Sequence, residues 1–409
     1  MDTTIGVIGL GYVGLPLALT AVESGWNVIG YDKNSDLIRG LLSGNSHIDD
    51  VSNERLTTGI SGGKFTVVDS PNSLSKVDIC IICVPTPTTI DHHPDLTYVK
   101  SAANSISKIL NVNCVVVNES TSYPGTLRNV IQQEIASTRA DLGDIAGYVA
   151  APERVDPKNT QFNHSNTPRV LGGDDLVQVH RVSDFYRSLG PEVKVVSSPE
   201  AAELSKLVEN AFRLVNISFV NELAPYASAL GVDLIEVLNA AATKPFGFMK
   251  FTPGPGVGGH CIPVDPHYLL DSASRLEVEL PVLNSAIEVN LKVPQKILEK
   301  VQEILGHDSK SAVLLIGIAY KHGISDTRET PALQIAEGLG KMGCNVFWTD
   351  NAVTTWESAP KYSGQEIDLA IALSSSTLSQ LEQVPGHVRI LDCTGNHSSL
   401  SNVISYFNS

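Results

Sequence analysis

The sequence predicts an α/β protein with two open parallel-sheet domains joined by a central helical domain that contains a long helix. Three observations lead to this prediction. The chain has 409 residues, which suits two to three domains at about 150 residues each. Short apolar runs alternate with helix-like segments near both ends of the chain, whereas the middle has long helical patterns. We therefore expect domains over residues 1–197, 198–296 and 297–409.

The first forty residues have the clearest pattern of secondary structure. A short apolar strand is expected over Thr4–Ile8, and a glycine-rich turn follows it directly. A helical pattern over Leu15–Glu23 ends at Gly25, and a second buried strand over Trp26–Tyr31 leads to Asp32. The order of strand, glycine-rich turn, helix and strand is the order of a mononucleotide-binding unit.

The turn itself has the pattern of a dinucleotide site, Gly9-Leu10-Gly11-Tyr12-Val13-Gly14. Gly9 permits the tight bend, Gly11 lets the backbone approach a pyrophosphate, and Gly14 lets the helix pack closely on the strand. The first N–H groups of the helix then face the phosphates. Asp32 accepts hydrogen bonds from a ribose 2′-hydroxyl and repels a 2′-phosphate, so the sequence predicts NAD rather than NADP. A tight connection without a ligand is the less favoured alternative.

The next α/β elements continue this domain. The uniformly apolar run Val77–Val84 predicts a strand that is buried on both faces. It contains Cys80 and Cys83, which are three apart and so point to opposite faces of a strand. Both are therefore expected to pack in the core rather than to bind a metal. Further strands are expected over Lys64–Val68, Cys114–Asn118 and Tyr148–Ala150, with a helix over Thr126–Thr138.

From Pro199 onward the pattern becomes helical. A long helix is expected over Glu200–Ala229, with Pro225 kinking or interrupting it. A loop rich in proline and glycine over Pro253–Gly259 breaks the regular structure. Other helices are expected over Val232–Ala241, Val282–Leu305 and Pro331–Met342, and later strands over Ala312–Ile318, Asn345–Thr349, Asp368–Leu373 and Val388–Asp392.

Composition and charge exclude several classes of function. The net charge is −15, with 29 basic and 44 acidic residues, which argues against binding to nucleic acid or to an anionic membrane surface. Six cysteines in 409 residues are too few for a disulfide scaffold. The N-terminal segment lacks the features of a signal peptide, and no apolar run reaches the ~18 residues of a membrane span. We therefore expect a cytoplasmic protein without membrane insertion.

The most unusual loop of the chain contains a cysteine. Cys261 follows two glycines and precedes Asp265 by four residues, which makes it a candidate nucleophile. The common alternative for a cysteine is a small buried hydrophobe, and this interpretation is applied to the other five. His260 is adjacent to Cys261 and is better explained as a hydrogen-bonding loop residue than as a base, because adjacent residues rarely present a base to a nucleophile.

Two further sets of polar residues need an interpretation. Lys206 and Asn210 are four apart and share one face of the long helix, where they would suit stabilisation of an oxyanion. From spacing alone, a solvated helix face is the better interpretation. His92 and His93 lie in a loop without metal-ligand spacing and are expected to be exposed to solvent. The sequence predicts no metal site.

The combined motifs resemble the nucleotide-sugar dehydrogenases, specifically the UDP-sugar 6-dehydrogenase family. The resemblance covers nearly the whole chain in the family's order. It implies an N-terminal NAD-binding Rossmann domain, a helical dimerisation domain and a C-terminal UDP-binding α/β domain. The motifs are GLGYVGLPLA from Gly9, ICVPTP from Ile82, ESTSYPGT from Glu119, APERVDP from Ala151, ELSKLVEN from Glu203, PGPGVGGHCIPVD from Pro253 and AYKHGISDTRETPAL from Ala319.

The resemblance implies a four-electron oxidation at C6 of a UDP-hexose with two NAD+, through a thiohemiacetal and a thioester on a cysteine. Cys261 matches that nucleophile, and a nearby ammonium such as Lys206 would favour its thiolate. Lys206 and Asn210 match the residues that stabilise the oxyanion. Asp265 and Thr121 match the pair that positions a water, and Glu153 matches the base for thioester hydrolysis.

The resemblance also implies ligand-binding positions. On the cofactor side these are the turn over Gly9–Gly14 with Tyr12 and Val13, and Asp32, Pro85, Thr86, Thr121 and Arg328. On the substrate side they are Arg154, Lys206, Asn210, Gly256, Gly258 and Lys321. The expected assembly is a homo-oligomer, in the first place a dimer.

The sequence departs from the family's patterns at three places. Arg154 and Val155 follow Pro152-Glu153 where UDP-glucose enzymes commonly have Phe-Leu, which resembles the branch acting on UDP-N-acetylhexosamines. Pro245, beside Lys244, stands near the place where the family has an arginine from the partner subunit. Leu37 stands where an arginine often follows the early aspartate. The substrate expected first is therefore UDP-N-acetylglucosamine or UDP-N-acetylmannosamine for surface polysaccharide synthesis, with UDP-glucose and a non-catalytic nucleotide-sugar binder as alternatives.

Overall fold

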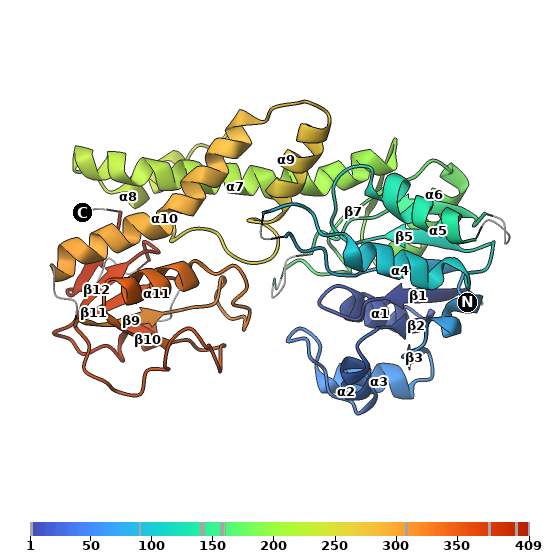
Figure 1. Ribbon diagram of the computed structural model, residues 1–409, viewed down its shortest axis with the longest axis horizontal. Helices are drawn as coiled ribbons and strands as arrows, with labels where there is room; N and C mark the ends of the chain where they lie inside the picture. Colours follow the sequence, from blue (N-terminus) through green and yellow to red (C-terminus); the bar gives the residue numbers. More distant parts are fainter. Residues whose placement is uncertain are drawn as a thin grey trace. The chain divides into compact units, whose positions relative to one another are not determined.

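The computed structural model describes residues 3–89, 91–139, 144–155, 159, 161–306, 310–374, 378–396 and 400–407. Its contacts divide the chain into two compact units. The N-terminal unit contains residues 1–209 and 267–276, and the C-terminal unit contains residues 210–266 and 277–409. Both units combine a sheet with helices, so the predicted α/β class is confirmed (Figure 1). Among the described helices, none has the length and apolar character that crossing a bilayer requires.

The N-terminal unit is built on one eight-stranded sheet in the order β3-β2-β1-β4-β5-β6-β7-β8. Neighbouring strands run parallel except β6 and β7, which are antiparallel. The chain leaves the sheet in opposite directions after β1 and β4, which creates a topological switch point at their carboxyl ends. The strands are β1 (Thr4–Ile8), β2 (Asn27–Tyr31), β3 (Phe65–Val68), β4 (Ile79–Ile82), β5 (Val115–Asn118), β6 (Gly147–Ala150), β7 (Arg169–Gly172) and β8 (Val193–Val196).

The helices of this unit cover the sheet. The expected helix over Thr126–Thr138 is a π-helical turn followed by an α-helix, and the expected strands of this unit are all present, some of them shorter. The sequence analysis assigned neither β7 nor β8. The elements are α1 (Gly14–Glu23), α2 (Ser35–Leu42), α3 (Asn53–Ser61), η1 (Pro71–Lys76), α4 (Thr97–Ser107), η2 (Leu127–Gln132), α5 (Gln133–Thr138) and α6 (Leu176–Ser188).

Strand β4 lies in the interior of the sheet, between β1 and β5. Every residue of Ile79–Ile82 is therefore buried. Cys83 belongs to the main core cluster of the unit. Cys80 and Cys114 are fully buried as well, and burial raises the pKa of both thiols, that of Cys114 to about 12. The interpretation of these three cysteines as packing residues is confirmed.

Helix α7 (Pro199–Leu230) runs without a break through Pro225, so of the two expected alternatives, a kink or an interruption, the interruption is wrong. A proline inside a helix removes one backbone hydrogen bond and crowds the preceding turn. Here Val220, Ala224 and Ala227 on both sides of the proline are buried in an apolar cluster. This packing stabilises the helix across the position where local propensity disfavours it.

The C-terminal unit has a smaller sheet of five parallel strands in the order β10-β9-β11-β12-β13. The switch point of this sheet lies between β9 and β11, in the same way as between β1 and β4. Its elements are α8 (Leu234–Ala241), α10 (Pro281–Leu305), β9 (Ala312–Ile316), α11 (Pro331–Lys341), β10 (Asn345–Thr349), β11 (Leu369–Ala372), α12 (Leu378–Leu381), β12 (Arg389–Asp392) and β13 (Val403–Ser405).

Helix α9 (Asp265–Arg275) was not expected from the sequence, and most of it belongs to the N-terminal unit. The hydroxyl of the fully buried Tyr268 donates to the Thr86 carbonyl at 2.8 Å. The ring of His267 stacks on that of His92, with centroids 4.4 Å apart. These contacts attach α9 to the loop that follows β4.

Candidate active site

The glycine-rich turn between β1 and α1 has the geometry of a dinucleotide-binding turn. Gly9 has a φ of +87°, and a Cβ there would lie 2.4 Å from the Cys83 carbonyl oxygen. A Cβ on Gly14 would lie 1.9 Å from the Gly9 carbonyl oxygen. Both positions therefore require glycine to bring the helix onto the strand. The Gly9 N–H donates to the Tyr31 carbonyl at 2.8 Å, which ties the turn to β2.

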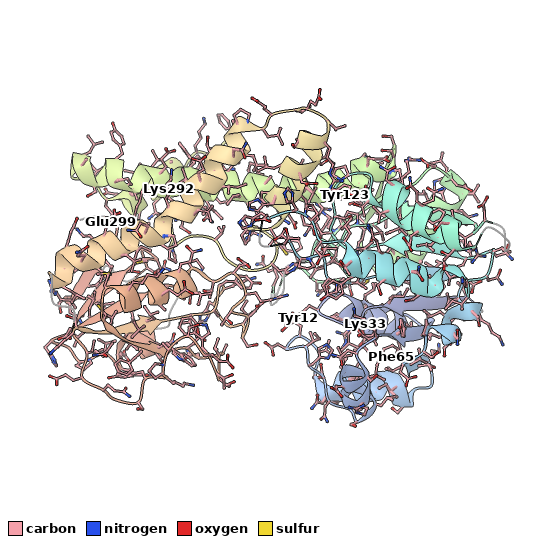
Figure 2. All side chains as sticks on the ribbon, viewed as in Figure 1. Tyr12, Lys33, Phe65, Tyr123, Lys292 and Glu299 are labelled. Atoms are coloured by element: carbon pink, nitrogen blue, oxygen red, sulfur yellow. The ribbon has the colours of Figure 1, made fainter. Side chains whose placement is uncertain are left out.

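Gly11 differs from the other two glycines, because a Cβ at this position would meet nothing within 4 Å. Its freedom from packing leaves the backbone open on this side of the turn, as a pyrophosphate would require. The neighbouring Tyr12, labelled in Figure 2, is exposed, with 46% of its surface accessible. Val13 is half-buried. The residues present therefore fit a dinucleotide at the N-terminus of α1.

Asp32 stands at the carboxyl end of β2 and faces this turn. Its Oδ2 accepts the Leu10 N–H at 2.9 Å, and its Oδ1 accepts the Asn34 N–H at 2.8 Å. Each carboxylate oxygen has a second lone pair that these bonds leave unused. Asp32 therefore orders the turn and can still accept a hydrogen bond from a ribose.

Three predicted cofactor positions lie in loops at the same edge of this sheet. Pro85 is exposed and Thr86 is buried in the loop after β4. Thr121 is half-buried in the loop after β5, three residues beyond Asn118. Because parallel strands place their carboxyl ends at one edge, all three belong to the edge that carries the glycine-rich turn.

The cysteine loop is held within the C-terminal unit by amide side chains. The Gly254 N–H donates to Asn221 at 2.8 Å, and the Val257 N–H donates to Asn290 at 2.8 Å. The Gly259 N–H donates to the Arg328 carbonyl at 3.0 Å. These bonds fix the loop against α7, α10 and the loop after β9.

The glycines of this loop are required by packing inside the protein. A Cβ on Gly258 would lie 2.7 Å from the Glu329 carbonyl oxygen and 2.8 Å from the Tyr320 Cβ. A Cβ on Gly259 would lie 2.7 Å from the Tyr320 ring. Gly256 has a φ of +110° and would meet other atoms only at ordinary contact distances. The backbone at Gly256 is thus the more open of the two predicted substrate positions.

Cys261 is the one cysteine that the structure exposes, whereas Cys80, Cys83, Cys114 and Cys393 are buried and Cys344 is half-buried. Its carbonyl accepts the Asp265 N–H at 2.9 Å, which places Cys261 one turn before α9. Asp265 is buried, and its Oδ2 accepts the Asn210 side-chain N–H at 2.5 Å. The structure therefore brings three predicted catalytic residues together at the start of α9.

Lys206 lies one turn before Asn210 on α7 and is buried. None of the residues that the structure describes forms a hydrogen bond or an ion pair with its ammonium. A solvated helix face, which spacing alone favours, is therefore the wrong interpretation of this position. A lysine whose side chain is mostly buried and whose ammonium has no partner among the described residues is suited to an anionic ligand.

Arg154 is occupied by contacts within the N-terminal unit. Its guanidinium pairs with Glu209 on α7 at 2.5 Å and donates to the Pro168 carbonyl at 2.7 Å. These contacts connect the loop after β6 to the same turn of α7 as Lys206 and Asn210. The last two residues of the APERVDP motif, Asp156 and Pro157, lie outside the described residues.

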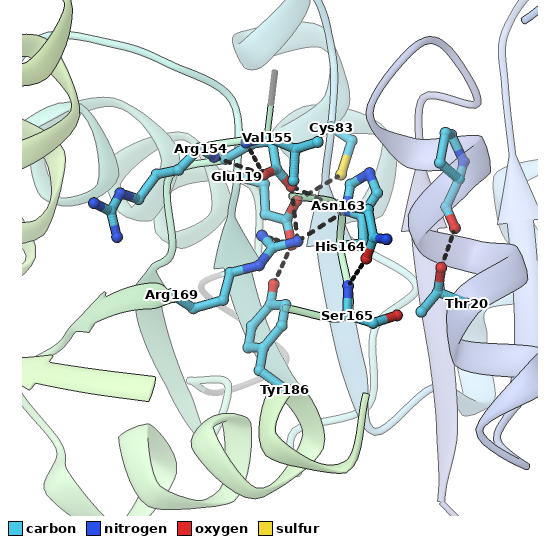
Figure 3. A network of polar contacts seen from close by, with 12 residues as sticks. Thr20, Cys83, Glu119, Arg154, Val155, Asn163, His164, Ser165, Arg169 and Tyr186 are labelled. Carbon is cyan, nitrogen blue, oxygen red and sulfur yellow. Dashed lines mark hydrogen bonds and ion pairs between the residues drawn. The ribbon is translucent and has the colours of Figure 1, made fainter. Parts of the chain in front are cut away.

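Glu153 belongs to a buried network of charged groups (Figure 3). Its Oε2 lies 2.7 Å from Arg169 and 3.3 Å from the His164 Nδ1. Its Oε1 accepts the N–H groups of Arg154 and Val155 at 2.6 and 2.7 Å. Burial alone would raise the pKa of this carboxyl, but Arg169 and His164 outweigh burial and hold the pKa well below its ordinary value. Glu153 is therefore ionised at neutral pH.

Glu119 shares Arg169 with Glu153. The Arg169 Nη1 lies 3.1 Å from the Glu119 Oε1, and the Tyr186 hydroxyl also donates to this carboxylate. The Cys83 thiol lies 3.9 Å from its other oxygen. Burial raises the pKa of Glu119 and outweighs the opposing effect of Arg169. The two carboxyls thus have opposite protonation tendencies around one cation.

The turn after β9 carries the remaining predicted residues. Lys321 is half-buried in this turn. The Arg328 guanidinium pairs with Asp326 at 2.6 Å, in the C-terminal unit. The pKa of His260 is lowered by burial and by the nearby Arg328 cation. Asp326 has the opposite effect on this pKa but does not outweigh them. His92 and His93 are exposed, as expected, although His93 also contacts Asp271 at 3.1 Å.

Glu119, His164, Arg169 and Tyr186 were not expected from the sequence to form a set. A signal was present, because Glu119 follows an apolar strand and Arg169 begins one. Charged residues at the ends of buried strands face the edge where ligands bind in parallel sheets.

Comparison with known proteins supports the interpretation of both units. Residues 3–190 match the NAD binding domain of the UDP-glucose/GDP-mannose dehydrogenase family, residues 200–292 its central domain and residues 314–384 its UDP binding domain. A UDP-N-acetyl-D-mannosamine dehydrogenase of Pyrococcus horikoshii is 35% identical over 339 residues, covering 81% of this chain and 80% of that protein. One from Escherichia coli K12 is 35% identical over 351 residues, covering 82% of each chain.

Solved structures show the same relationship. The UDP-D-ManNAc dehydrogenase of Pyrococcus horikoshii aligns with a TM-score of 0.88 at 28% identity, over 98% of each chain. A UDP-glucose dehydrogenase of Pyrobaculum islandicum aligns with a TM-score of 0.91 at 25% identity, over 99% of this chain and 97% of that one. The matched NAD binding domain and the glycine-rich turn agree on NAD as the cofactor. The chain belongs to the UDP-glucose/GDP-mannose dehydrogenase family and is an NAD-dependent dehydrogenase of nucleotide sugars.

Proposed function

We propose that this enzyme oxidises the C6 hydroxymethyl group of a UDP-N-acetylhexosamine to a carboxylate. One substrate alcohol, two NAD+ and one water give one uronate, two NADH and three protons. The observation that carries the choice of sugar is the 35% identity to UDP-N-acetyl-D-mannosamine dehydrogenases over four-fifths of the chain. The Pro152-Glu153-Arg154 sequence supports the same branch. The C2 configuration of the sugar is then the one of N-acetylmannosamine or N-acetylglucosamine.

The N-terminal unit holds the cofactor in this proposal. The turn over Gly9–Gly14 binds the pyrophosphate, Asp32 binds the adenosine ribose, and Pro85 and Thr86 line the cofactor site. Bound NAD+ accepts a hydride from C6 in each of the two oxidations. Arg328 is proposed to approach the pyrophosphate, and its pairing with Asp326 would then have to loosen.

Cys261 is the proposed nucleophile. Its sulfur adds to the C6 aldehyde that the first oxidation produces, and the second oxidation converts the resulting thiohemiacetal to a thioester. Cys261 is exposed, whereas four of the other cysteines are buried and Cys344 is half-buried, which supports this choice. Lys206 and Asn210 stabilise the oxyanion, and the burial of both residues, with no partner for the Lys206 ammonium among the described residues, supports that role.

Hydrolysis of the thioester is assigned to three residues. Water adds to the carbonyl carbon, the C–S bond breaks, and Cys261 leaves as the thiolate. Asp265 and Thr121 position the water, and Glu153 accepts its proton. The hydrogen bond between Asn210 and Asp265 supports a shared role for the groups at the start of α9.

Substrate contacts on the UDP side are proposed for Lys321 and the backbone at Gly256 and Gly258. Packing explains the absence of a side chain at Gly258, so Gly256 is the stronger candidate of the two. Arg154 is occupied by Glu209 and Pro168, which supports an indirect role through α7.

A panel of UDP-sugars tests the proposed activity. UDP-N-acetylmannosamine, UDP-N-acetylglucosamine, UDP-N-acetylgalactosamine and UDP-glucose are each incubated with NAD+, and NADH and product mass are followed. We expect turnover of an acetamido sugar with two NADH per sugar. Preference for UDP-glucose would contradict the sugar assignment, and one NADH per sugar would contradict the four-electron reaction.

The covalent step has its own test. Cys261→Ser should lose formation of the uronate by a factor of about a thousand or more, because a hydroxyl forms no thioester. Cys344→Ser is a matched control in the same unit and should keep full activity. Formation of uronate by Cys261→Ser at the wild-type rate would exclude the covalent mechanism.

A second candidate is the oxidation of UDP-glucose by the same chemistry. It is favoured by the close structural similarity to the UDP-glucose dehydrogenase of Pyrobaculum islandicum. The sugar panel decides between the two substrates.

Assembly, location and domain boundaries are also proposed. A stripe of exposed apolar residues follows one face of α7, which supports a homodimer through this helix. We further propose a cytoplasmic enzyme that supplies uronic acids for a surface polysaccharide, with the division at residues 197 and 296. The stripe consists of Leu204, Val208, Phe212, Phe219, Tyr226 and Leu230.

A further inference from the structure

We propose that Arg169 is the positioning residue that keeps Glu153 ionised and correctly oriented for thioester hydrolysis. The inference rests on the proposed role of Glu153 as the proton acceptor in that step. It assigns a function to Arg169 and Glu119, which the sequence motifs left without one.

Glu153 is contacted at both of its carboxylate oxygens, by hydrogen bonds at Oε1 and by an ion pair at Oε2. Two backbone N–H groups, of Arg154 and Val155, bind Oε1 at 2.6 and 2.7 Å. Arg169 lies 2.7 Å from Oε2. The two N–H groups come from the loop that follows Glu153, and the guanidinium comes from the start of β7. The carboxylate therefore has a single orientation set by two different segments of the chain.

Arg169 is itself held from its other side. Its Nη1 lies 3.1 Å from Glu119, and its guanidinium lies over the ring of Tyr186, 4.8 Å from the centroid. The Tyr186 hydroxyl donates to Glu119 and so closes the arrangement (Figure 3). All of these side chains are buried. Arg169 is thus the shared cation of two carboxyls, one of which is proposed to take part in hydrolysis.

The charges around Glu153 come from every element packed against it. Arg169 is the permanent cation, and His164 lies 3.3 Å away on the loop before β7. On the opposite side are Glu119 after β5, Tyr186 on α6 and the Cys83 thiol after β4. The last three are acids, so each becomes more difficult to ionise when its neighbours carry negative charge. Arg169 contacts both carboxyls and so favours the ionised form of each.

A purely structural ion pair would explain the same contacts, but it makes different predictions. If Arg169 only holds the fold together, its loss lowers stability and changes all steps of the reaction at every pH. If it sets the ionisation of Glu153, its loss raises the pKa of Glu153, and hydrolysis then slows selectively as the pH falls.

The test follows the thioester on Cys261 in single turnovers. Full-length enzyme is mixed with NAD+ and the UDP-sugar that the panel identifies, quenched, and measured as intact protein by mass spectrometry from pH 5 to 9. In wild type we expect a hydrolysis rate without an acidic limb from Glu153, because the carboxyl stays ionised in this range. In Arg169→Gln we expect a limb between pH 5 and 7, with hydrolysis at pH 6 at least tenfold slower than in wild type.

Three variants separate the possibilities. Glu119→Gln removes the competing carboxyl, so it should not create the limb, and combined with Arg169→Gln it should move the limb back to lower pH. Arg169→Lys keeps the charge and should retain most of the hydrolysis at pH 6, which keeps the test valid if Arg169→Gln does not fold. Arg128→Gln is the matched control, because Arg128 pairs with Asp174 and Glu200 at 2.5 and 2.8 Å outside the network.

The outcomes distinguish this inference from the proposed function. No NADH from wild type with any UDP-sugar would refute the proposed function itself. Two NADH per sugar, combined with equal pH profiles of wild type, Arg169→Gln and Arg128→Gln, would refute the role of Arg169. Hydrolysis by Glu153→Gln at the wild-type rate would refute it too, since Arg169 would then have no base to position.

Discussion

In both units, the turn after one strand is hydrogen-bonded to the end of the neighbouring parallel strand. The chain after this turn differs between the two units. In the N-terminal unit the Gly9 N–H donates to the Tyr31 carbonyl at 2.8 Å, and Asp32 accepts the Leu10 N–H. In the C-terminal unit the Gly317 N–H donates to the Thr349 carbonyl at 2.9 Å, and Asp350 accepts the Ile318 N–H. A carboxylate at the end of the second strand therefore orders the turn after the first strand in both units.

The two turns lead into different segments of the chain. Helix α1 begins at Gly14, directly after the glycine-rich turn, so its N-terminal N–H groups are close to the end of β1. Helix α11 begins only at Pro331, after a long loop that carries Lys321 and Arg328. The first arrangement offers backbone N–H groups and a helix dipole to a pyrophosphate. The second offers the cationic side chain of Lys321, which suits the proposed UDP-sugar ligand.

A side chain at Gly14 should have the largest effect on the difference between the two turns. Gly14→Ala places a Cβ 1.9 Å from the Gly9 carbonyl oxygen, so the helix must move away from the turn. We expect a loss of about 3–5 kcal/mol in stability and loss of NAD binding. Thermal unfolding and calorimetric titration with NAD+ measure the two effects.

Gly340→Ala is the matched control in α11, because a Cβ there meets nothing within 4 Å. It should leave NAD binding unchanged and stabilise its helix by about 0.5–1 kcal/mol. Equal behaviour of the two variants would contradict the direct connection of turn and helix in the N-terminal unit.

The next largest effect on stability is expected from Glu203, another carboxylate that accepts backbone N–H groups. Glu203 is buried and binds the N–H groups of Gly125 and Leu127 at 2.6 and 2.8 Å, and burial raises its pKa to about 7. The folded protein then holds a proton that the unfolded chain releases above its ordinary pKa of 4.5. Stability from this group is full below pH 4.5 and is lost as the pH rises to about 7.

Glu203→Gln should remove this pH dependence, on the order of 2–3 kcal/mol between pH 5 and 8. Urea unfolding of both proteins at the two pH values measures the difference. A difference between variant and wild type that is the same at pH 5 and pH 8 would mean that Glu203 is ionised throughout. Asp32 and Asp350 differ from Glu203 in being only half-buried.

Substitution of Asp32 and Asp350 tests whether the two turns bind different ligands. Asp350 accepts four N–H groups, of Ile318, Ala319, Ala352 and Val353. Asp350→Asn should therefore lower stability by about 1–3 kcal/mol and leave the KM for NAD unchanged. Asp32→Asn should raise the KM for NAD about tenfold with a smaller loss of stability. A raised KM for the UDP-sugar in Asp350→Asn would show that this carboxylate binds ligand as well.

The smallest expected effect concerns the cationic loop of the C-terminal unit. Lys321→Met should raise the KM for the UDP-sugar about tenfold, which is the loss of one charge-assisted contact, and leave the KM for NAD unchanged. Lys341→Met, on the exposed end of α11, is the control and should change neither value. Steady-state kinetics with each substrate varied in turn provide the measurement. An effect of Lys321→Met on the KM for NAD alone would assign this loop to the cofactor.

Sequence patterns were sufficient where structure is determined locally. The turn over Gly9–Gly14 and Asp32 were predicted because these residues follow each other in one strand–helix–strand segment. Burial of β4 was predicted for a similar reason, since an unbroken apolar run has few other places in a fold.

Sequence patterns did not predict the features that depend on contacts between residues far apart in the chain. Glu119 and Tyr186 are 67 residues apart, and nothing local indicates that the tyrosine hydroxyl donates to the carboxylate. Helix α7 continues through Pro225 because buried neighbours stabilise it, and Lys206 is buried by packing that helical spacing does not encode. Helix α9 has the polar sequence DPHYLLDSASR, whose attachment depends on Tyr268 and the Thr86 carbonyl.

The attachment of α9 has a consequence for the order in which the protein is made. The N-terminal unit is assembled from two separate stretches of the chain, and its last part is residues 267–276. During synthesis the ribosome must therefore complete most of the central helices before the Thr86 carbonyl can accept the Tyr268 hydroxyl. A nascent chain that ends at residue 209 lacks this partner. An excised fragment of residues 1–209 would lack the same helix, so a complete first unit has to include residues from both stretches of the chain.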